Sequence, residues 1–137
     1  MDGWYSEGTE VVFACGGPVC ESCDAAAQAN GGKMIGVDVD QSGRDDNVIT
    51  SAMKGLTEAV NTALSDIEAG EWGDIAASNG NFGLEDGDYV GLPTDADSWN
   101  FKTFTTDEYE ALKTVDNSSD DSTKPTVSEF TTVNYIQ

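Results

Sequence analysis

The stretch GVDVDQSGRDDNVITSAMK, residues 36–54, decides the fold. A short apolar run within it ends at two aspartates, Asp38 and Asp40, and a second apolar run ends at Lys54. Both runs are rich in β-branched residues and a polar loop separates them, which is typical of two buried strands. Because ligands of parallel α/β sheets bind at the carboxyl ends of the strands, all three charged residues lie where a ligand would bind, and Asp38 and Lys54 are the candidate ligand-binding residues.

The segments on either side of this stretch alternate between strand and helix signals. The expected elements are a strand over 10–15, a helix over 19–30, strands over 33–40 and 48–53, and a helix over 54–73 with Gly70 as its C-cap. The first of these strands is one continuous apolar run, which predicts burial on both of its faces. The order predicts an α/β fold: a mostly parallel, Rossmann-like sheet flanked by helices.

The remainder of the chain has weaker patterns. Residues 71–104 are rich in glycine and aspartate and predict short strands and loops, with apolar runs at 74–78, 88–93 and 100–104. Thr105 and Glu108 form a capping box that predicts a helix start, with Phe104 packing on Tyr109 as a hydrophobic staple. We expect residues 1–115 to form one domain and residues 116–137 to form an acidic linker and a closing strand over 126–136.

Composition excludes several classes of partner. The chain has 137 residues, enough for one domain, and a formal net charge of −20, which would repel a nucleic acid or an anionic membrane. The opening residues, MDGWYSEGTE, have neither the basic nor the apolar region of a signal peptide. This start indicates either a cytoplasmic chain or a natural N-terminus further upstream.

The side chains at the predicted sheet edge suit a sugar. A carboxylate such as that of Asp38 accepts hydrogen bonds from two adjacent hydroxyls, and the Lys54 ammonium donates to the same hydroxyls. Gly16 and Gly17, after the first strand, let backbone N–H groups approach a ligand. The alternative is that Asp38 only ends a strand and that Lys54 is a surface charge, although a lysine in a first helical turn opposes the helix dipole.

Longer motifs resemble a known family. GTEVVFACGG, GKMIGVDVDQS, VITSAMKGL, GLP and FKTFTTDEYEAL occur in this order and are similar to the carboxyl-terminal part of the basic membrane protein (BMP) family of solute-binding lipoproteins, the purine nucleoside receptor A group. The resemblance covers most of residues 7–115. It implies a lobe of a type I periplasmic binding protein, in which Asp38 and Lys54 bind the ribose hydroxyls of a nucleoside and Gly16 and Gly17 line the same cleft.

The resemblance also implies a cellular location and a partner for the protein. The protein would be the extracytoplasmic, lipid-anchored binding component of an ATP-driven (ABC) importer, with a permease as partner, no cofactor and no catalytic step. The family's lipobox, signal peptide and amino-terminal lobe have no counterpart here, so we expect this chain to be a fragment. In the family the helix after Lys54 packs on the first lobe, so we expect its apolar stripe to be exposed here and to drive formation of a homodimer.

Two other functions remain open. Cys20 and Cys23 form a CxxC motif at the start of a predicted helix, the setting of a thiol–disulfide enzyme, although Cys15 is then unexplained. With no histidine and three thiols, a zinc site would need a carboxylate or water as its fourth ligand. The acidic, threonine-rich tail suggests an extracellular interaction module without a small ligand. The aromatic residues Trp72, Trp99, Phe101 and Phe104 are interpreted as packing within the lobe.

Overall fold

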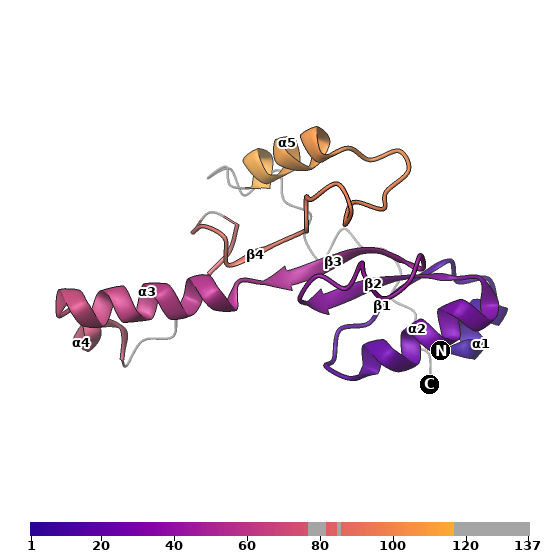
Figure 1. Ribbon diagram of the computed structural model, residues 1–137, viewed down its shortest axis with the longest axis horizontal. Coiled ribbons are helices and arrows are strands. Elements are labelled where there is room, and N and C mark those ends of the chain that lie inside the picture. The colour runs from indigo at the N-terminus through magenta and orange to yellow at the C-terminus, as the bar shows by residue number, and fades with distance from the viewer. Residues whose placement is uncertain (77–81, 85, 117–137) are drawn as a thin grey trace, which may run out of the picture.

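The computed structural model describes residues 1–76, 82–84 and 86–116 (Figure 1). Its four-stranded sheet runs in the order β1 (Val11–Phe13), β2 (Lys33–Asp38), β3 (Val48–Lys54), β4 (Val90–Gly91). The first three strands are parallel, and β4 is antiparallel to β3. The predicted α/β class with a mostly parallel sheet is confirmed. The strand expected over 126–136 lies outside the described residues.

Helices lie on both sides of this sheet (Figure 1). The short α1 (Asp2–Ser6) and α2 (Val19–Asn30) lie on one side, and α5 (Thr106–Asp116) lies on the other. Two further helices, α3 (Leu56–Ala69) and α4 (Trp72–Ile75), extend away from the carboxyl end of β3. The fold therefore has a compact α/β body and one projecting arm.

The main core lies between the sheet and the pair α1–α2. Met34 and Val48 from the strands and Cys23 and Ala27 from α2 are fully buried there. Tyr5 of α1 closes this core, donating a hydrogen bond to the Lys33 carbonyl (2.7 Å). The remaining members of the cluster are Val12, Ala14, Cys20 and Ala26. Cys20 and Cys23, the two residues of the CxxC motif, both belong to this core. The motif is therefore part of the apolar packing.

One expectation about the first strand is wrong. Residues 10–15 were expected to form a strand buried on both faces, but β1 has three residues, and Val11 and Phe13 are 42% and 50% exposed. Only Val12, between them, points into the core. The reason is tertiary: the described part of the chain packs closely against only one face of β1.

The position of Lys54 also differs from its expected place in a helix. Lys54 is the last residue of β3, and α3 begins two residues later, after Gly55. Lys54 is therefore not in the first turn of the helix, where the helix dipole was expected to be unfavourable for its charge. At the other end, Gly70 has a φ of 82° and caps α3, as predicted. Residues 72–75, expected to divide between the end of the long helix and a short strand, form the separate turn α4.

The capping box of the last helix is confirmed. The Glu108 backbone N–H donates to Thr105 Oγ1 (3.2 Å), and the Thr105 N–H donates to a Glu108 carboxylate oxygen (2.8 Å). The two rings of the expected staple, Phe104 and Tyr109, both pack on Trp99, at centroid distances of 5.7 and 5.8 Å. Trp99, Phe101 and Phe104 thus pack within the lobe as expected, whereas Trp72 is 49% exposed.

Candidate functional site

The ends of β2 and β3 bring two of the predicted ligand-binding residues to one edge of the sheet. In the parallel register Asp38 is paired with Met53, and Lys54 is the next residue along β3. Adjacent strands lie about 4.8 Å apart, so the Asp38 and Lys54 backbones are close neighbours. Both side chains are exposed, and within the described residues they form no ion pair with each other. Their charged groups are thus available to a ligand.

The backbone at Asp38 has an unusual conformation. Its φ is 68°, and it is the one non-glycine residue with positive φ in the described part of the chain. The Val39 N–H donates to the Val37 carbonyl (2.9 Å), which closes a three-residue γ-turn around Asp38. Aspartate is among the few residues that tolerate this region, and such strained positions cluster at functional sites.

The two predicted glycines lie in the turn that joins β1 to α2. Gly17 has a φ of 59°, which favours glycine. A Cβ at Gly16 would lie 3.2 Å from Val19 Cγ1, so a side chain there would press on the first residue of α2. Both glycines are exposed and follow the strand next to β2. The turn after β1 and the last residues of β2 and β3 therefore carry the four residues predicted to bind ligand: Gly16, Gly17, Asp38 and Lys54.

Asp40, the second aspartate of the motif, has a different role. Its Oδ2 accepts hydrogen bonds from Ser98 Oγ (2.6 Å) and Ser42 Oγ (3.0 Å), and Oδ1 accepts one from the Ser42 N–H (2.9 Å). Partial burial acts to raise the pKa of Asp40, but these hydrogen bonds, led by that from Ser98, outweigh it and lower the pKa. Asp40 thus ties the loop after β2 to the segment that leads to α5.

This network predicts a dependence of stability on pH. Because the folded-state pKa of Asp40 lies below its ordinary value of 3.8, its contribution is complete above that value and is lost as pH falls through the folded-state pKa. We expect Asp40→Asn to lower the free energy of unfolding by about 1 kcal/mol or less at pH 6. Urea unfolding from pH 6 to pH 2.5 should show the difference from wild type shrinking below about pH 4; a constant difference would contradict this.

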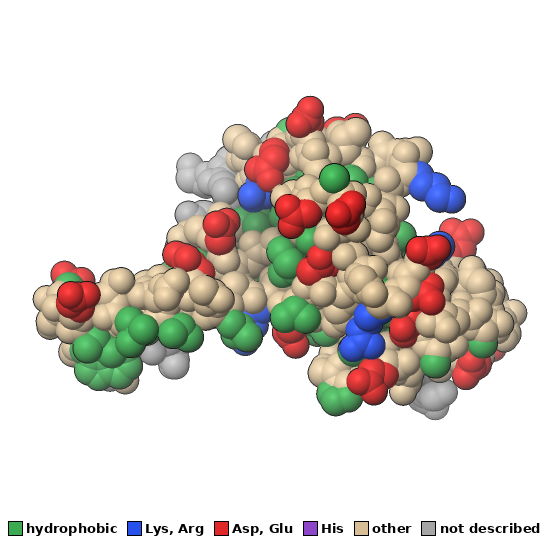
Figure 2. Space-filling view, in the orientation of Figure 1, with side chains coloured by type: hydrophobic (Ala, Val, Ile, Leu, Met, Phe, Trp, Pro, Cys, Tyr) green, Lys and Arg blue, Asp and Glu red, His purple; other side chains and the backbone are tan. Residues whose placement is uncertain are grey.

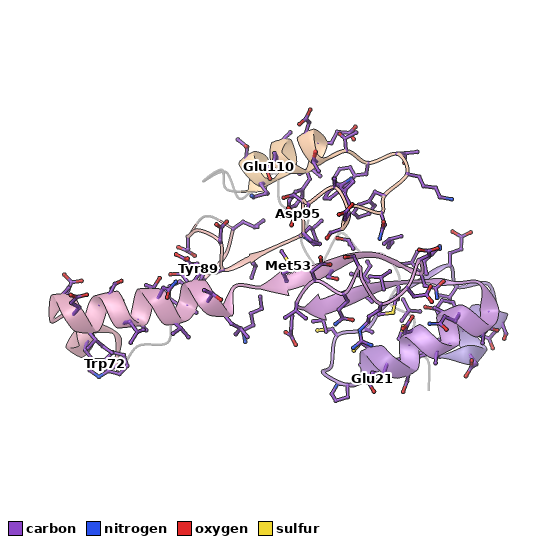
Figure 3. All side chains as sticks on the ribbon, viewed as in Figure 1. Glu21, Met53, Trp72, Tyr89, Asp95 and Glu110 are labelled. Carbon is purple, nitrogen blue, oxygen red and sulfur yellow. The ribbon has the colours of Figure 1, made fainter. Side chains whose placement is uncertain are left out.

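A cavity of about 350 Å³ adjoins the same strand end. Figure 3 shows Asp95 between Met53 of β3 and Glu110 of α5, and all three residues line this cavity. Lys54 lines it as well, but Asp38 and the two glycines do not. The cavity therefore does not coincide with the predicted site. Its α5 wall, which includes Tyr109 and Lys113, was missed by sequence reasoning because no local pattern links α5 to β3.

The environment of the cysteines bears on the redox alternative. Cys20 is 5% exposed and Cys23 is fully buried, with its Sγ 3.6 Å from the Tyr5 hydroxyl. Burial raises the pKa of Tyr5 well above its usual range, with the neighbouring Cys23 adding to the shift. A reactive dithiol needs access to its substrate. These two thiols are packed under the sheet, which disfavours an exchange reaction.

The described residues contain neither a metal-binding cluster nor a membrane-spanning helix. In residues 1–76, 82–84 and 86–116, no cysteine and carboxylate side chains gather in threes as a metal site would require. Over the same residues, the helices are too short or too polar for any of them to cross a membrane.

Comparison with known proteins places the chain in a family. The family model described as ABC transporter substrate-binding protein PnrA-like matches residues 2–136, almost the whole chain. No curated protein and no solved structure gave a significant match. Members of this family are extracytoplasmic proteins that bind a small solute and deliver it to an ABC permease. The chain belongs to the PnrA-like family of ABC transporter substrate-binding proteins.

Proposed function

We propose that this chain is the carboxyl-terminal lobe of a purine nucleoside receptor and that it holds the ribose between Asp38 and Lys54. The observation that supports this most directly is the placement of an exposed carboxylate and an exposed ammonium at adjacent carboxyl ends of β2 and β3. That arrangement suits two vicinal hydroxyls, which accept hydrogen bonds from the lysine and donate to the carboxylate. Residues 1–115 form the lobe in this proposal, and residues 116–137 form a linker and closing strand.

We further propose that a first lobe packs on α3. No residue of α3 is buried, although the helix has an apolar stripe. Figure 2 shows this stripe as a row of hydrophobic side chains along one edge of the projecting arm. The stripe consists of Leu56, Val60, Leu64, Ile67 and, from α4, Trp72, each about half exposed. A continuous apolar face of this kind is typical of an interface.

The remaining features follow from the family. The receptor captures its solute without a chemical step and passes it to the permease when the lobes close. A lipid anchor outside the described residues would hold it at the cell membrane. No observation in the described residues favours a thiol–disulfide enzyme, and the tail that suggested an interaction module lies outside them.

Calorimetry with adenosine and 2′-deoxyadenosine tests this function. We expect a two-lobed receptor to bind the ribonucleoside more tightly, because the deoxy compound lacks one of the two clamped hydroxyls. We expect this chain alone to bind adenosine with a Kd above about 100 μM, since a cleft between lobes buries most of a ligand only when both are present. Tight one-to-one binding by the monomeric chain would show that the site is not divided between lobes.

The exposed stripe also predicts self-association of the chain alone. A second copy can cover the apolar face of α3 when no first lobe is present, while the net charge of −20 opposes the contact. High salt screens that repulsion, so light scattering should show a dimer fraction that rises with salt. Leu64→Glu should abolish the dimer, whereas Ser65→Glu, an exposed position on the opposite face of the same helix, should leave most of it. A wild-type chain that stays monomeric at all salt concentrations would contradict the prediction.

A further inference from the structure

The γ-turn at Asp38 needs something to hold it, because an L-residue at positive φ is in an unfavourable conformation. The turn is closed by one hydrogen bond, from the Val39 N–H to the Val37 carbonyl. Its outer side is exposed at Asp38 and Val39, and the carboxylate of the next residue, Asp40, accepts hydrogen bonds from Ser42 and Ser98. A second hydrogen bond to the turn itself comes from its inner side, where the chain returns towards β3.

Gln41 occupies that inner position. Its residue is 7% exposed, and its Nε2 donates to the Val37 carbonyl at 2.9 Å, the same oxygen that accepts the turn's own hydrogen bond. Its backbone N–H donates to Ser51 Oγ at 3.0 Å. Gln41 is thus bonded to β2 through its side chain and to β3 through its backbone, directly after the turn that carries Asp38.

Gly36 makes room for this side chain. A Cβ added at Gly36 would lie 2.9 Å from Gln41 Cβ and 2.7 Å from Ser51 Oγ, both too close. The Gln41 side chain therefore lies against the bare backbone of β2. Gly36, Gln41 and Ser51 all belong to the motifs quoted above. Together they form one buried cluster beneath the Asp38 turn.

Space filling alone does not account for a glutamine here. Its Oε1 is buried and has no hydrogen-bond partner in the described part of the chain. An unsatisfied buried oxygen is unfavourable, so an apolar side chain of the same size would fill the space better. What glutamine adds over such a side chain is the Nε2 donor, and that donor points at the γ-turn.

We propose that Gln41 is a positioning residue that holds Asp38 in its left-handed conformation and so directs the carboxylate to the ligand. The first half of this inference concerns the turn alone, and the second half rests on the proposed function. Gln41 does not contact the ligand in this account. It orients Asp38, which contacts the ligand. Gly36 in turn leaves the space that the Gln41 side chain occupies.

Nuclear magnetic resonance on the 137-residue chain tests both halves. Gln41→Met keeps the size of the side chain and removes the donor, and Gly36→Ala displaces the side chain while leaving glutamine in the sequence. Gln28→Met is the matched control, because Gln28 is exposed on α2. The Asp38 carbon shifts and its H–N–Cα–H coupling report φ without any ligand. Titration with adenosine and 2′-deoxyadenosine, followed at the Gly16, Gly17 and Lys54 amides, reports binding.

We expect both test variants to remain folded, to lose the left-handed signature of Asp38, and to weaken adenosine binding about tenfold or more. Their preference for adenosine over 2′-deoxyadenosine should also disappear, while Gln28→Met behaves as wild type. An unchanged Asp38 conformation in Gln41→Met would overturn the proposal. A changed conformation with unchanged adenosine binding would overturn its ligand half. If the wild-type chain shows no response even to millimolar adenosine, the ribose contact proposed for this lobe fails, whereas the Asp38 signals still decide whether Gln41 holds the turn.

Discussion

Asp38→Ala and Lys54→Ala are each expected to weaken adenosine binding to a two-lobed receptor by about 2–4 kcal/mol. This corresponds to a roughly 30- to 700-fold rise in Kd. The two residues end adjacent strands and form no ion pair with each other in the described structure, and in the proposed site both bind one ligand. Removing one charge leaves the other buried in the closed cleft without its partner. Isothermal calorimetry on each variant measures the loss.

Three comparisons make this prediction specific to a ribose clamp. The double variant should lose less than the sum of the single losses, because both residues contact one sugar. The preference for adenosine over 2′-deoxyadenosine should vanish in Asp38→Ala. Lys102→Ala is the matched control, since Lys102 is exposed and does not follow β2 or β3. If ribose discrimination survives in Asp38→Ala, or if Lys102→Ala causes an equal loss, the clamp is wrong.

Gly55→Ala is expected to destabilise the fold by about 3 kcal/mol. A Cβ at Gly55 would overlap the Asp88 carbonyl oxygen and approach Tyr89 Cα, and these are backbone atoms that cannot rotate away. The Gly55 N–H also donates to the Tyr89 carbonyl (2.7 Å), extending the pairing of β3 with β4. The added methyl group must separate the two strands. Urea unfolding followed by tryptophan fluorescence measures the loss.

Gly3→Ala is the control for this change. Gly3 lies in α1, and a Cβ there meets no atom within 4 Å. Alanine has the higher helix propensity, so this variant should be as stable as wild type or slightly more stable. A Gly55→Ala protein as stable as Gly3→Ala would show that the β3–β4 connection adapts to a side chain.

The loss in Gly55→Ala should also appear locally. The Cβ added at Gly55 would displace the backbone at Asp88 and Tyr89. The Tyr89 hydroxyl lies 2.7 Å from Thr62 Oγ1 on α3. Its ring stacks on Phe82 at a centroid distance of 4.5 Å. Figure 3 shows Tyr89 at the base of the arm, between α3 and β4. We therefore expect faster amide exchange in α3 of the variant, because this contact helps to hold the arm to the body.

Short-range patterns determined the α/β class, the carboxyl-edge position of Asp38 and Lys54, and the capping box of α5. Each depends on neighbours within a few residues: a run of β-branched residues, a strand end, a threonine followed by glutamate. The glycine cap of α3 was predictable for the same reason, since Gly70 adopts a positive φ that other residues resist. The resemblance to the BMP family of solute-binding proteins also came from ordered short motifs, and the family match confirmed it.

Only the tertiary structure decided which faces are covered and how the site residues are held. A hydrophobic pattern shows that a face is apolar but does not show which element covers it. The exposure of Val11 and Phe13 and the cavity beside α5 therefore could not be predicted from local sequence. The turn at Asp38 is a second case. Its positive φ depends on Gln41 reaching back to Val37 over Gly36 and bonding to Ser51 on the next strand. Such contacts arise from the register of two strands, which no single stretch of sequence contains.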